Sequence, residues 1–386
     1  MLLYRFVDIW ARITMFFFFR KIKVTGKENI PKGPVSVIFA PNHQSAFLDP
    51  IVVVLNCGKE PWFLTRASVF KGNFVKKLLK TMHLIPVFRP RDMVDMKTAN
   101  NQTFEFCHEA LMKGEDLMIF PEGNHGMQKR LRTPLKKGIG RIAYRAAMAM
   151  QNNPEKDVMI VPVGINYDHP TGMRTDLLLQ FGAPLSMKAY LANEHSEVAV
   201  LKVLREDLAK GLQDLMIDIR PKERYDELEK AWQQQREYLP SLPERFSNDK
   251  KIIAALSASE TLPSTPTKKR PRGVLHTILL VLGFPFWLLG LLLNIPFILG
   301  SRYLLDKVVS DTHFLQSIKF ICIMVGVPLF TLITAGILHA FTGSFWIFVA
   351  LIPFLGLLAY EYQTRILKTP ALILTKDLAG EFLPED

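Results

Sequence analysis

The chain has 386 residues, of which 49% are hydrophobic, and it carries 48 Lys and Arg against 36 Asp and Glu. A mean hydropathy of +0.14 is high for a soluble protein, and the aromatic and aliphatic content excludes a collagen-like or disordered chain. The three cysteines, Cys57, Cys107 and Cys322, form no C-x-x-C pair, which argues against a disulfide scaffold and a thiolate metal site.

The first element expected is a helix over residues 1–20. Arg5, Asp8 and Arg12 recur at helical spacing and share one face, while most of the other residues are apolar. Three charges argue against a membrane span, and no cleavage site of a signal peptide is present. We therefore expect an interfacial amphipathic helix whose Phe16–Phe19 segment dips into lipid; the alternative is a buried core helix.

Residues 21–238 alternate between short apolar runs and helical patterns, which predicts one α/β domain with a mixed sheet covered by helices. The expected strands are Val35–Ala40, Leu117–Phe120, Val158–Val163 and Leu177–Phe181. The expected helices are Ile51–Asn56, Val69–Met82, Val94–Lys113, Gly138–Asn152, Val198–Asp218 and Lys222–Arg236.

Basic residues are concentrated in this region. Between Pro61 and Arg145 there are 16 Lys and Arg against 7 Asp and Glu. Lys71, Lys76, Lys77 and Lys80 interleave with apolar residues, which suits anionic lipid headgroups or phosphate-bearing substrates; the alternative is a solvated basic surface. No zinc-finger spacing, ribonucleoprotein motif or basic run before a heptad repeat occurs, so nucleic acid is not an expected partner.

The segment 239–272 is predicted to be a linker because it is rich in Pro, Ser and Thr. It ends in the basic cluster Lys268–Arg272, which places the preceding domain on the cytoplasmic side of a membrane. We expect the protein to be an integral membrane protein, in a bacterial inner membrane.

A membrane-spanning region is predicted over residues 273–362, followed by a cytoplasmic tail, 363–386. Gly273–Ser301 and Phe320–Tyr360 contain no Asp, Glu, Lys or Arg. A span needs about 20 apolar residues, so the 41-residue second stretch fits two spans that turn near Phe341–Ser344. The first stretch fits one tilted span or a re-entrant hairpin broken at Pro285 and Pro296.

Polar residues of chemical interest follow two of the expected strands. Val35–Ala40 leads into a loop with His43 and, at the start of the next helix, Asp49. An imidazole can accept a proton near neutral pH, and a carboxylate on its other ring nitrogen would fix its tautomer. The simpler alternative is a helix cap beside a structural histidine.

The second loop follows Leu117–Phe120 and reads Pro121-Glu122-Gly123-Asn124-His125-Gly126. Its glycines allow backbone N–H groups to approach a ligand, although an ordinary strand-end turn has the same composition. Arg89 ends a further short apolar run, where a guanidinium can clamp a phosphate.

In this order the blocks resemble those of the glycerolipid acyltransferases, over about residues 22–185. They are Asn42-His43 with a downstream Asp49, Arg89 after a short strand, Phe120-Pro121-Glu122-Gly123, and Val161-Pro162-Val163. The family includes glycerol-3-phosphate and 1-acylglycerol-3-phosphate acyltransferases. The resemblance implies that His43 is the general base, that Asp49 is its catalytic partner, and that Arg89, Glu122 and Gly123 hold a phosphorylated acceptor.

This sequence departs from the family pattern at three places, one of which is His83, where the family often has the Gly that opens the Arg block. Five residues separate His43 from Asp49, whereas four are usual; the longer spacing looks like the branch that includes fungal-type glycerol-3-phosphate and dihydroxyacetone-phosphate acyltransferases. The usual Thr-Arg-Ser after Glu-Gly is replaced by Asn124-His125-Gly126. Asn124 therefore joins the predicted substrate-binding residues, and Arg132 or Lys137, or else Arg130, is predicted to replace the missing Arg.

The implied reaction is acyl transfer from acyl-CoA or acyl carrier protein to a glycerol-phosphate hydroxyl, with no cofactor and no metal. Backbone N–H groups near Gly123 are expected to stabilise the oxyanion. Two other classes stay open. A metal-dependent hydrolase or oxidase would use His43, Asp49, Glu122 and His125, with a second Glu-x-x-His at Glu105 and His108. A membrane scaffold would carry a decayed site.

Overall fold

The computed structural model describes residues 2–88, 96–194, 196–259, 274–309, 311–368 and 373. The chain divides into two compact units. The first comprises Met1–Trp232 and Arg236–Glu260, and the second comprises Gln233–Gln235 and Thr261–Asp386. Each unit is described by itself.

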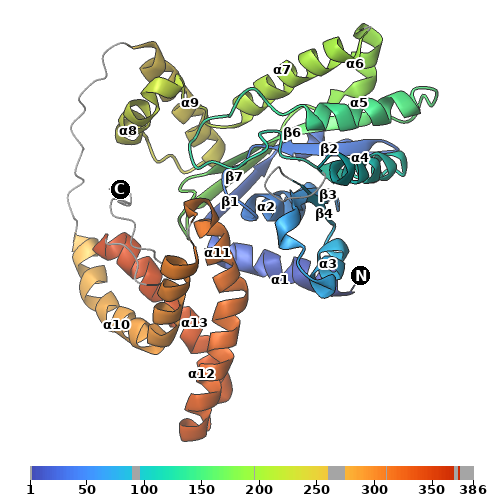
Figure 1. Ribbon diagram of the computed structural model, residues 1–386. Coiled ribbons are helices and arrows are strands. Elements are labelled where there is room, and N and C mark those ends of the chain that lie inside the picture. Colours follow the sequence, from blue (N-terminus) through green and yellow to red (C-terminus); the bar gives the residue numbers. More distant parts are fainter. Residues whose placement is uncertain are drawn as a thin grey trace. The chain divides into compact units, whose positions relative to one another are not determined.

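The first unit is built on an eight-stranded mixed sheet in the order β1-β7-β6-β2-β5-β3-β4, with β8 paired to β6 (Figure 1). The strands are β1 (Lys21–Thr25), β2 (Ser36–Pro41), β3 (Trp62–Arg66), β4 (Leu84–Val87), β5 (Leu117–Met118), β6 (Val158–Tyr167), β7 (Asp176–Phe181) and β8 (Leu185–Ser186). The prediction of a mixed sheet covered by helices is confirmed.

The central strands run in one direction. β2 pairs in parallel with both β5 and β6, and β3 pairs in parallel with β4 and β5. The carboxyl ends of β2, β3, β4, β5 and β6 therefore meet at one edge of the sheet. In open α/β sheets this is the edge where ligands bind.

Helices cover both faces of this sheet. They are α1 (Leu2–Phe18), α2 (Leu48–Cys57), α3 (Asn73–Thr81), α4 (Met96–Met112), α5 (Gly138–Met150), α6 (Met187–Asn193), α7 (Glu197–Leu215), α8 (Tyr225–Gln235) and α9 (Leu242–Ala258). Side chains of α4, α5 and α7 form one buried core with Ile38 and Ala40 of β2. Successive strand residues point to opposite faces, so Val37 and Phe39, also buried, face the other side.

The predicted N-terminal helix exists, but part of the segment expected to enter lipid is buried in the fold. Ala11, Met15, Phe18 and Phe19 are buried in the first unit, so the prediction that all of Phe16–Phe19 dips into lipid is wrong for its second half. A second stripe of the same helix is exposed: Phe6, Ile9, Ile13, Phe16 and Phe17. Nearly every position is apolar, so sequence periodicity did not separate the buried stripe from the exposed one.

The prediction of a continuous linker over residues 239–272 is wrong for residues 242–258, which form α9. Pro243 lies in the first turn of that helix, where a missing N–H costs nothing. α9 also contributes Arg245, whose side chain is 7% exposed and binds Asp176 Oδ2 at 2.9 Å. The helix thus belongs to the fold of the first unit.

The second unit is helical: α10 (Val274–Tyr303), α11 (Leu315–Ile321), α12 (Val327–Thr342) and α13 (Phe345–Glu361), with π-helical turns between or after them. Three helical runs are long and apolar enough to cross a membrane, namely His276–Lys307, Thr312–Thr342 and Phe345–Leu367. The predicted turn near residues 341–344 is confirmed, because Gly343 takes the left-handed conformation (φ 72°) that ends α12.

Contacts within the second unit decide between the two interpretations of residues 273–301. The Tyr362 hydroxyl donates to Leu280 O (2.6 Å), and Asn294 Nδ2 donates to Ile352 O (3.3 Å), so α10 first runs antiparallel to α13.

Farther along, Phe297 meets Phe330, and Leu305 packs with Leu315 near the start of the Thr312–Thr342 run. The Thr312–Thr342 run and α13 form a hairpin whose turn is at Gly343. Leu280 contacts Tyr362 and Leu305 contacts Leu315, so both leucines lie at the end of the hairpin opposite this turn. α10 therefore doubles back, as Figure 1 shows, and Pro296 lies within the reversal. The contacts favour the re-entrant hairpin.

Candidate active site

His43 and Asp49 meet at the carboxyl edge of the sheet. β2 ends at Pro41, so His43 is in the loop that follows, and Asp49 lies in the first turn of α2. His43 Nδ1 is 2.7 Å from Asp49 Oδ2. The His43 side chain is 14% exposed and that of Asp49 is fully buried, so the ring reaches solvent and its partner does not.

The loop wraps around the Asp49 carboxylate. The backbone N–H groups of Gln44 and Ser45 both donate to Asp49 Oδ2, each at 2.8 Å. On the other side, the Tyr167 hydroxyl donates to Asp49 Oδ1 at 2.8 Å. A buried carboxylate needs such donors, because burial without them is costly. The five-residue spacing thus closes a tight loop in which the aspartate organises the backbone next to His43.

Glu122 anchors the same loop from β5. Its Oε1 accepts the His43 N–H at 2.7 Å, and its Oε2 accepts from the N–H and Nε of Arg132 at 3.0 and 3.1 Å. Glu122 is 7% exposed. Both oxygens are turned toward the protein and hold the His43 loop to Arg132, and the predicted role of Glu122 in holding an acceptor stays a prediction.

Gly123 and Asn124 are exposed beside this anchor. Gly123 has φ 71°, and its N–H donates to Phe120 O at 3.1 Å. The Gly123 N–H is thus engaged within the turn itself, and an oxyanion site formed by other N–H groups near Gly123 stays a prediction. Asn124 contributes its backbone carbonyl, which accepts from the Arg132 guanidinium.

The predicted basic residues differ in where they lie. Arg132 is at the site, since its Nη2 is 3.3 Å from His43 O. Lys137 is exposed at the residue before α5, and Arg130 is partly buried. Arg89 lies outside the described residues. Of the three replacements considered for the missing arginine, the structure brings Arg132 to His43.

Comparison with known proteins bears on the same region. The family model described as Acyltransferase matches residues 21–166, which contain the strands, the dyad loop and Glu122. That domain belongs to the glycerolipid acyltransferase family.

Individual relatives are similar over parts of the chain. A chloroplastic 1-acyl-sn-glycerol-3-phosphate acyltransferase of Arabidopsis thaliana is 31% identical over 166 residues, 42% of this chain and 42% of that protein. Glycerol-3-phosphate O-acyltransferase 1 of Saccharomyces cerevisiae is 32% identical over 128 residues, 32% of this chain and 16% of that protein. The chain thus spans less than half the length of these relatives.

A solved structure, the 1-acyl-sn-glycerophosphate acyltransferase of Thermotoga maritima, has a TM-score of 0.39 and 18% sequence identity, covering 55% of this chain and 79% of that one.

Asn42, Phe120 and Arg66 also lie at this site, although no individual role was predicted for any of them. The side-chain amide of Asn42 joins the end of β2 to β6 by two hydrogen bonds. Its Nδ2 donates to Ile165 O at 3.1 Å, and its Oδ1 accepts from the Ile165 N–H at 2.6 Å. The ring of Phe120 stacks on His43, with centroids 4.0 Å apart. Arg66, at the end of β3, lies 3.4 Å from His125, whose ring is 5.4 Å from that of His43. Asn42 and Phe120 belong to blocks that resemble the family, whereas Arg66 is marked in the sequence only by its position at the end of a strand.

Burial shapes the protonation of two groups at the site. Burial raises the pKa of Glu122 above its ordinary value, and the nearby Arg132 guanidinium opposes this rise. Burial, with the neighbouring Asp49 charge, raises the pKa of Tyr167 well above its ordinary value. The Tyr167 hydroxyl therefore keeps its proton and acts as a donor.

The residues considered for a metal site are engaged otherwise. Residues 121–126 form turns, not a helix, as Pro121 and the glycines predict. Glu105 forms a bidentate pair with Arg145. The oxygens of Asp49 and Glu122 already accept protein donors, an arrangement that suits proton transfer at His43 better than cation binding.

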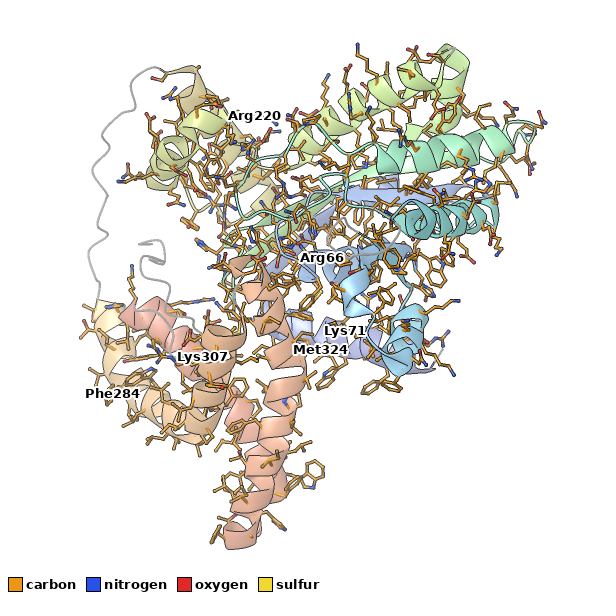
Figure 2. The ribbon with its side chains drawn as sticks, in the orientation of Figure 1. Arg66, Lys71, Arg220, Phe284, Lys307 and Met324 are labelled. Carbon is orange, nitrogen blue, oxygen red and sulfur yellow. The ribbon has the colours of Figure 1, made fainter. Side chains whose placement is uncertain are left out.

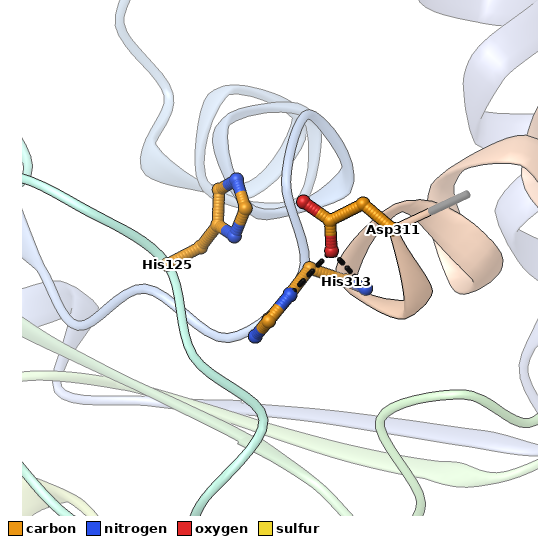
Figure 3. Close-up of side chains that lie close together, drawn as sticks. All are labelled: His125, Asp311 and His313. Carbon is orange, nitrogen blue, oxygen red and sulfur yellow. Dashed lines mark hydrogen bonds and ion pairs between the residues drawn. The ribbon is translucent and has the colours of Figure 1, made fainter. Parts of the chain in front are cut away.

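A further histidine–carboxylate pair occurs in the second unit. Asp311 Oδ1 is 2.5 Å from His313 Nδ1 and also accepts the His313 N–H at 3.0 Å (Figure 3). It caps the short 3-10 turn Thr312–Phe314. His125, drawn in the same figure, belongs to the first unit. We interpret the Asp311–His313 pair as a local cap.

Proposed function

We propose that the protein transfers a fatty acyl group from acyl-CoA or acyl carrier protein to a hydroxyl of glycerol 3-phosphate or 1-acylglycerol 3-phosphate, in phospholipid biosynthesis. The observation that carries this proposal is the His43–Asp49 pair, set at the carboxyl edge of the sheet in a glycerolipid acyltransferase domain. The names of the relatives from Arabidopsis thaliana and Saccharomyces cerevisiae support the two acceptors.

In the proposed mechanism His43 is the general base. Asp49 accepts a hydrogen bond from the Nδ1–H group of His43, which leaves the lone pair on Nε2 available. Nε2 takes the proton of the acceptor hydroxyl, and the oxygen attacks the thioester carbonyl. The tetrahedral intermediate collapses with cleavage of the C–S bond, and the imidazolium returns its proton to the leaving thiolate. Acceptor and donor react directly, so no acyl-enzyme forms.

Arginines near the dyad supply a binding site for the acceptor phosphate. Arg132 is held by Glu122 at the His43 carbonyl, and Arg66 lies beside His125. Arg66 is labelled in Figure 2 at the middle of the first unit. A guanidinium matches the geometry of a phosphate and carries a permanent charge. We propose Arg66 and Arg132 as phosphate ligands, together with Arg89, whose role rests on the resemblance alone.

The membrane supplies and receives the lipids of this reaction. The second unit exposes large apolar side chains on its helices, among them Phe284, labelled in Figure 2, and Phe341 and Trp346. We propose that it anchors the protein in the bilayer, with two full spans and a re-entrant α10. The basic cluster Lys268–Arg272 supports a cytoplasmic acyltransferase domain, and a bacterial inner membrane is the location we propose.

The test is an acyl-transfer assay on the purified full-length protein in detergent micelles. Radiolabelled acyl-CoA and acyl carrier protein are each offered with glycerol 3-phosphate, 1-acylglycerol 3-phosphate and unphosphorylated glycerol, and the products are separated by thin-layer chromatography. We expect a labelled phosphorylated product that disappears in His43→Ala and persists in His339→Ala, a histidine of α12. Full turnover by a folded His43→Ala protein would reject the mechanism.

The proposed phosphate ligands are tested by kinetics. Arg66→Ala, Arg89→Ala and Arg132→Ala should each raise the KM for the phosphorylated acceptor more than the KM for the thioester. Arg145→Ala, an exposed arginine of α5 that pairs with Glu105, is the matched control. Equal effects on both substrates would show that the arginine in question does not bind the acceptor phosphate.

A further inference from the structure

Tyr167 is a buried tyrosine whose hydroxyl faces the dyad from another strand. It is the last residue of β6 and is 1% exposed. Its hydroxyl reaches Asp49 Oδ1 at 2.8 Å, across 118 residues of sequence. The neighbouring strand β2 carries the His43 loop, so pairing of β2 with β6 places Tyr167 beside Asp49.

The two oxygens of Asp49 have different partners. Oδ2 takes His43 Nδ1 and the N–H groups of Gln44 and Ser45. Oδ1 takes the Tyr167 hydroxyl. Rotation of the carboxylate about its Cβ–Cγ bond moves both oxygens, so the Tyr167 donor on Oδ1 adds a second restraint on the plane to that of the three donors on Oδ2. Tyr167 therefore helps to set the direction in which Oδ2 faces the imidazole.

Tyr167 is itself held from two sides. Its ring stacks on that of Phe19, with centroids 6.0 Å apart and planes 12° apart. Lys129 Nζ donates to its backbone carbonyl at 2.5 Å. Phe19 directly follows α1, and it is 1% exposed, so the tyrosine ring and the end of α1 share one packed contact.

We propose that Tyr167 is a positioning residue for the Asp49–His43 dyad, and that Phe19 transmits the packing of α1 to the dyad through it. The inference rests on the proposed function, because it assigns a role in that reaction. α1 carries the exposed apolar stripe of Phe6, Ile9, Ile13, Phe16 and Phe17. The helix that presents this stripe is thus connected to the general base by Phe19, Tyr167 and Asp49.

The first experiment measures Tyr167→Phe in the full-length protein. A buried hydrogen bond to a charged group is worth about 1.5–3 kcal/mol, so kcat should fall by about 10-fold to 100-fold. The KM values should not change, because the hydroxyl is on the far side of Asp49 from the imidazole. Tyr190→Phe is the matched control, since its hydroxyl also donates to an aspartate, Asp207 at 2.6 Å, on the surface of α6 and α7.

A double-mutant cycle separates positioning from general destabilisation. In an Asp49→Asn background, Tyr167→Phe should have little further effect on kcat, because the group that it positions is already altered. Phe19→Leu should lower kcat by about 3-fold in the wild type, in keeping with a packing change below about 1.5 kcal/mol, and should not lower it in Tyr167→Phe. A wild-type kcat in Tyr167→Phe, or an equal fall in both backgrounds, would overturn the inference.

Hydrogen exchange supplies a readout that needs no activity. Release of the carboxylate in Tyr167→Phe should accelerate amide exchange of the loop residues Gln44 and Ser45, measured by mass spectrometry on peptides around residue 45, and Tyr190→Phe should leave it unchanged. Unchanged exchange would count against the positioning role. If the wild type transfers no acyl group, the proposed function fails by itself, and the exchange result still decides whether Tyr167 orders the dyad loop.

Discussion

The two units of the chain place charged and apolar side chains in opposite ways. The acyltransferase unit buries carboxylates: Asp49, Glu122 and Asp176 are at most 7% exposed. The C-terminal helices leave large apolar side chains outside, with Phe341 83% and Trp346 76% exposed. Burial of a carboxylate is costly unless donors surround it, and exposure of such apolar surface to water is unfavourable. Buried carboxylates with their donors indicate sites that the fold organises, and exposed apolar side chains indicate a surface suited to lipid.

Buried carboxylates within the first unit also differ among themselves. Asp176 binds the guanidinium groups of Arg20 and Arg245, whose charge does not titrate near neutral pH. Asp49 binds an imidazole and a phenol instead. An ion pair with arginine can only hold the fold together, whereas a histidine partner can move a proton. The kind of donor therefore distinguishes a structural aspartate from one that serves chemistry.

The largest effect expected from this distinction is on Asp49. Asp49→Asn should lower acyl transfer by about 10²-fold to 10⁴-fold, because His43 loses the acceptor that fixes its tautomer, while the thermal midpoint changes little. Asp176→Asn should do the reverse: it leaves the buried Arg245 and the more exposed Arg20 short of a partner, and breaking the buried Arg245 pair costs about 3–5 kcal/mol of stability. Parallel assays and melting curves compare them. A similar loss of activity in Asp49→Asn and Asp176→Asn would show that the two aspartates do not differ in function.

A second prediction concerns Lys129, a buried cation of the first unit. Burial, with the repulsion of Arg236, lowers the pKa of Lys129 from 10.5 to about 8. Between these values the unfolded chain binds more protons at this site than the folded chain, so folding stability rises with pH. The difference corresponds to about 3 kcal/mol over the full interval.

Lys129→Met removes this titration. From pH 7.5 to pH 9.5 the wild type should therefore gain stability relative to the variant, as followed by thermal or denaturant unfolding in the same detergent. Lys251→Met, on α9, controls for the loss of a lysine elsewhere in the unit. A constant difference between wild type and Lys129→Met across this pH range would contradict the prediction.

Membrane contact by the first unit is expected to be weaker and dependent on salt. The exposed stripe of α1 and the lysines of α3 lie near each other, since Tyr4 of α1 meets His83 just after α3 (Figure 1). A truncated protein that ends at Ser259, and so retains α9, should bind anionic vesicles peripherally. Each lysine near the surface contributes about 1 kcal/mol, so Lys77→Ala should weaken vesicle binding by about 5-fold.

Sedimentation with vesicles that contain or lack anionic lipid measures this binding. High salt should release part of the truncated protein, because exposed charges are screened beyond about 10 Å at 0.1 M salt. Lys230→Ala, a lysine of α8, is the control for charge alone. The full-length protein should require detergent for release. A truncated protein that stays in solution at low salt would show that only the C-terminal helices anchor the chain.

The smallest effect expected is that of Asn294, a polar residue among the apolar helices. It is 6% exposed, and its amide donates to Gly290 O and Ile352 O, which ties α10 to α13. Side-chain hydrogen bonds between membrane helices contribute about 0.6 kcal/mol on average. Asn294→Val should therefore lower the thermal midpoint slightly and leave acyl transfer unchanged. A large loss of activity would mean that this contact does more than pack helices.

Local patterns in the sequence were sufficient for much of the fold and for the central pair of the site. The apolar runs at β2, β6 and β7 are long enough to identify as strands, while β1 and β3 mix polar and apolar residues and were missed. The charge-free stretches show apolar helices of membrane-spanning length. His43 and Asp49 are six residues apart, so a loop and one helical turn suffice to bring them together.

What only the tertiary structure decided depends on contacts between distant segments. Tyr167 reaches Asp49 across 118 residues, and the link exists because β2 and β6 are neighbours in the sheet. Glu122 holds the His43 loop because β5 lies on the other side of β2, and α10 doubles back because its two ends meet Tyr362 and Leu315. Hydrophobic periodicity reports which local structure a segment favours. It does not show which polar group donates a hydrogen bond to a buried carboxylate, or which of two apolar helix stripes packs against the protein. Both depend on residues that are distant in the sequence and become neighbours only in the folded structure.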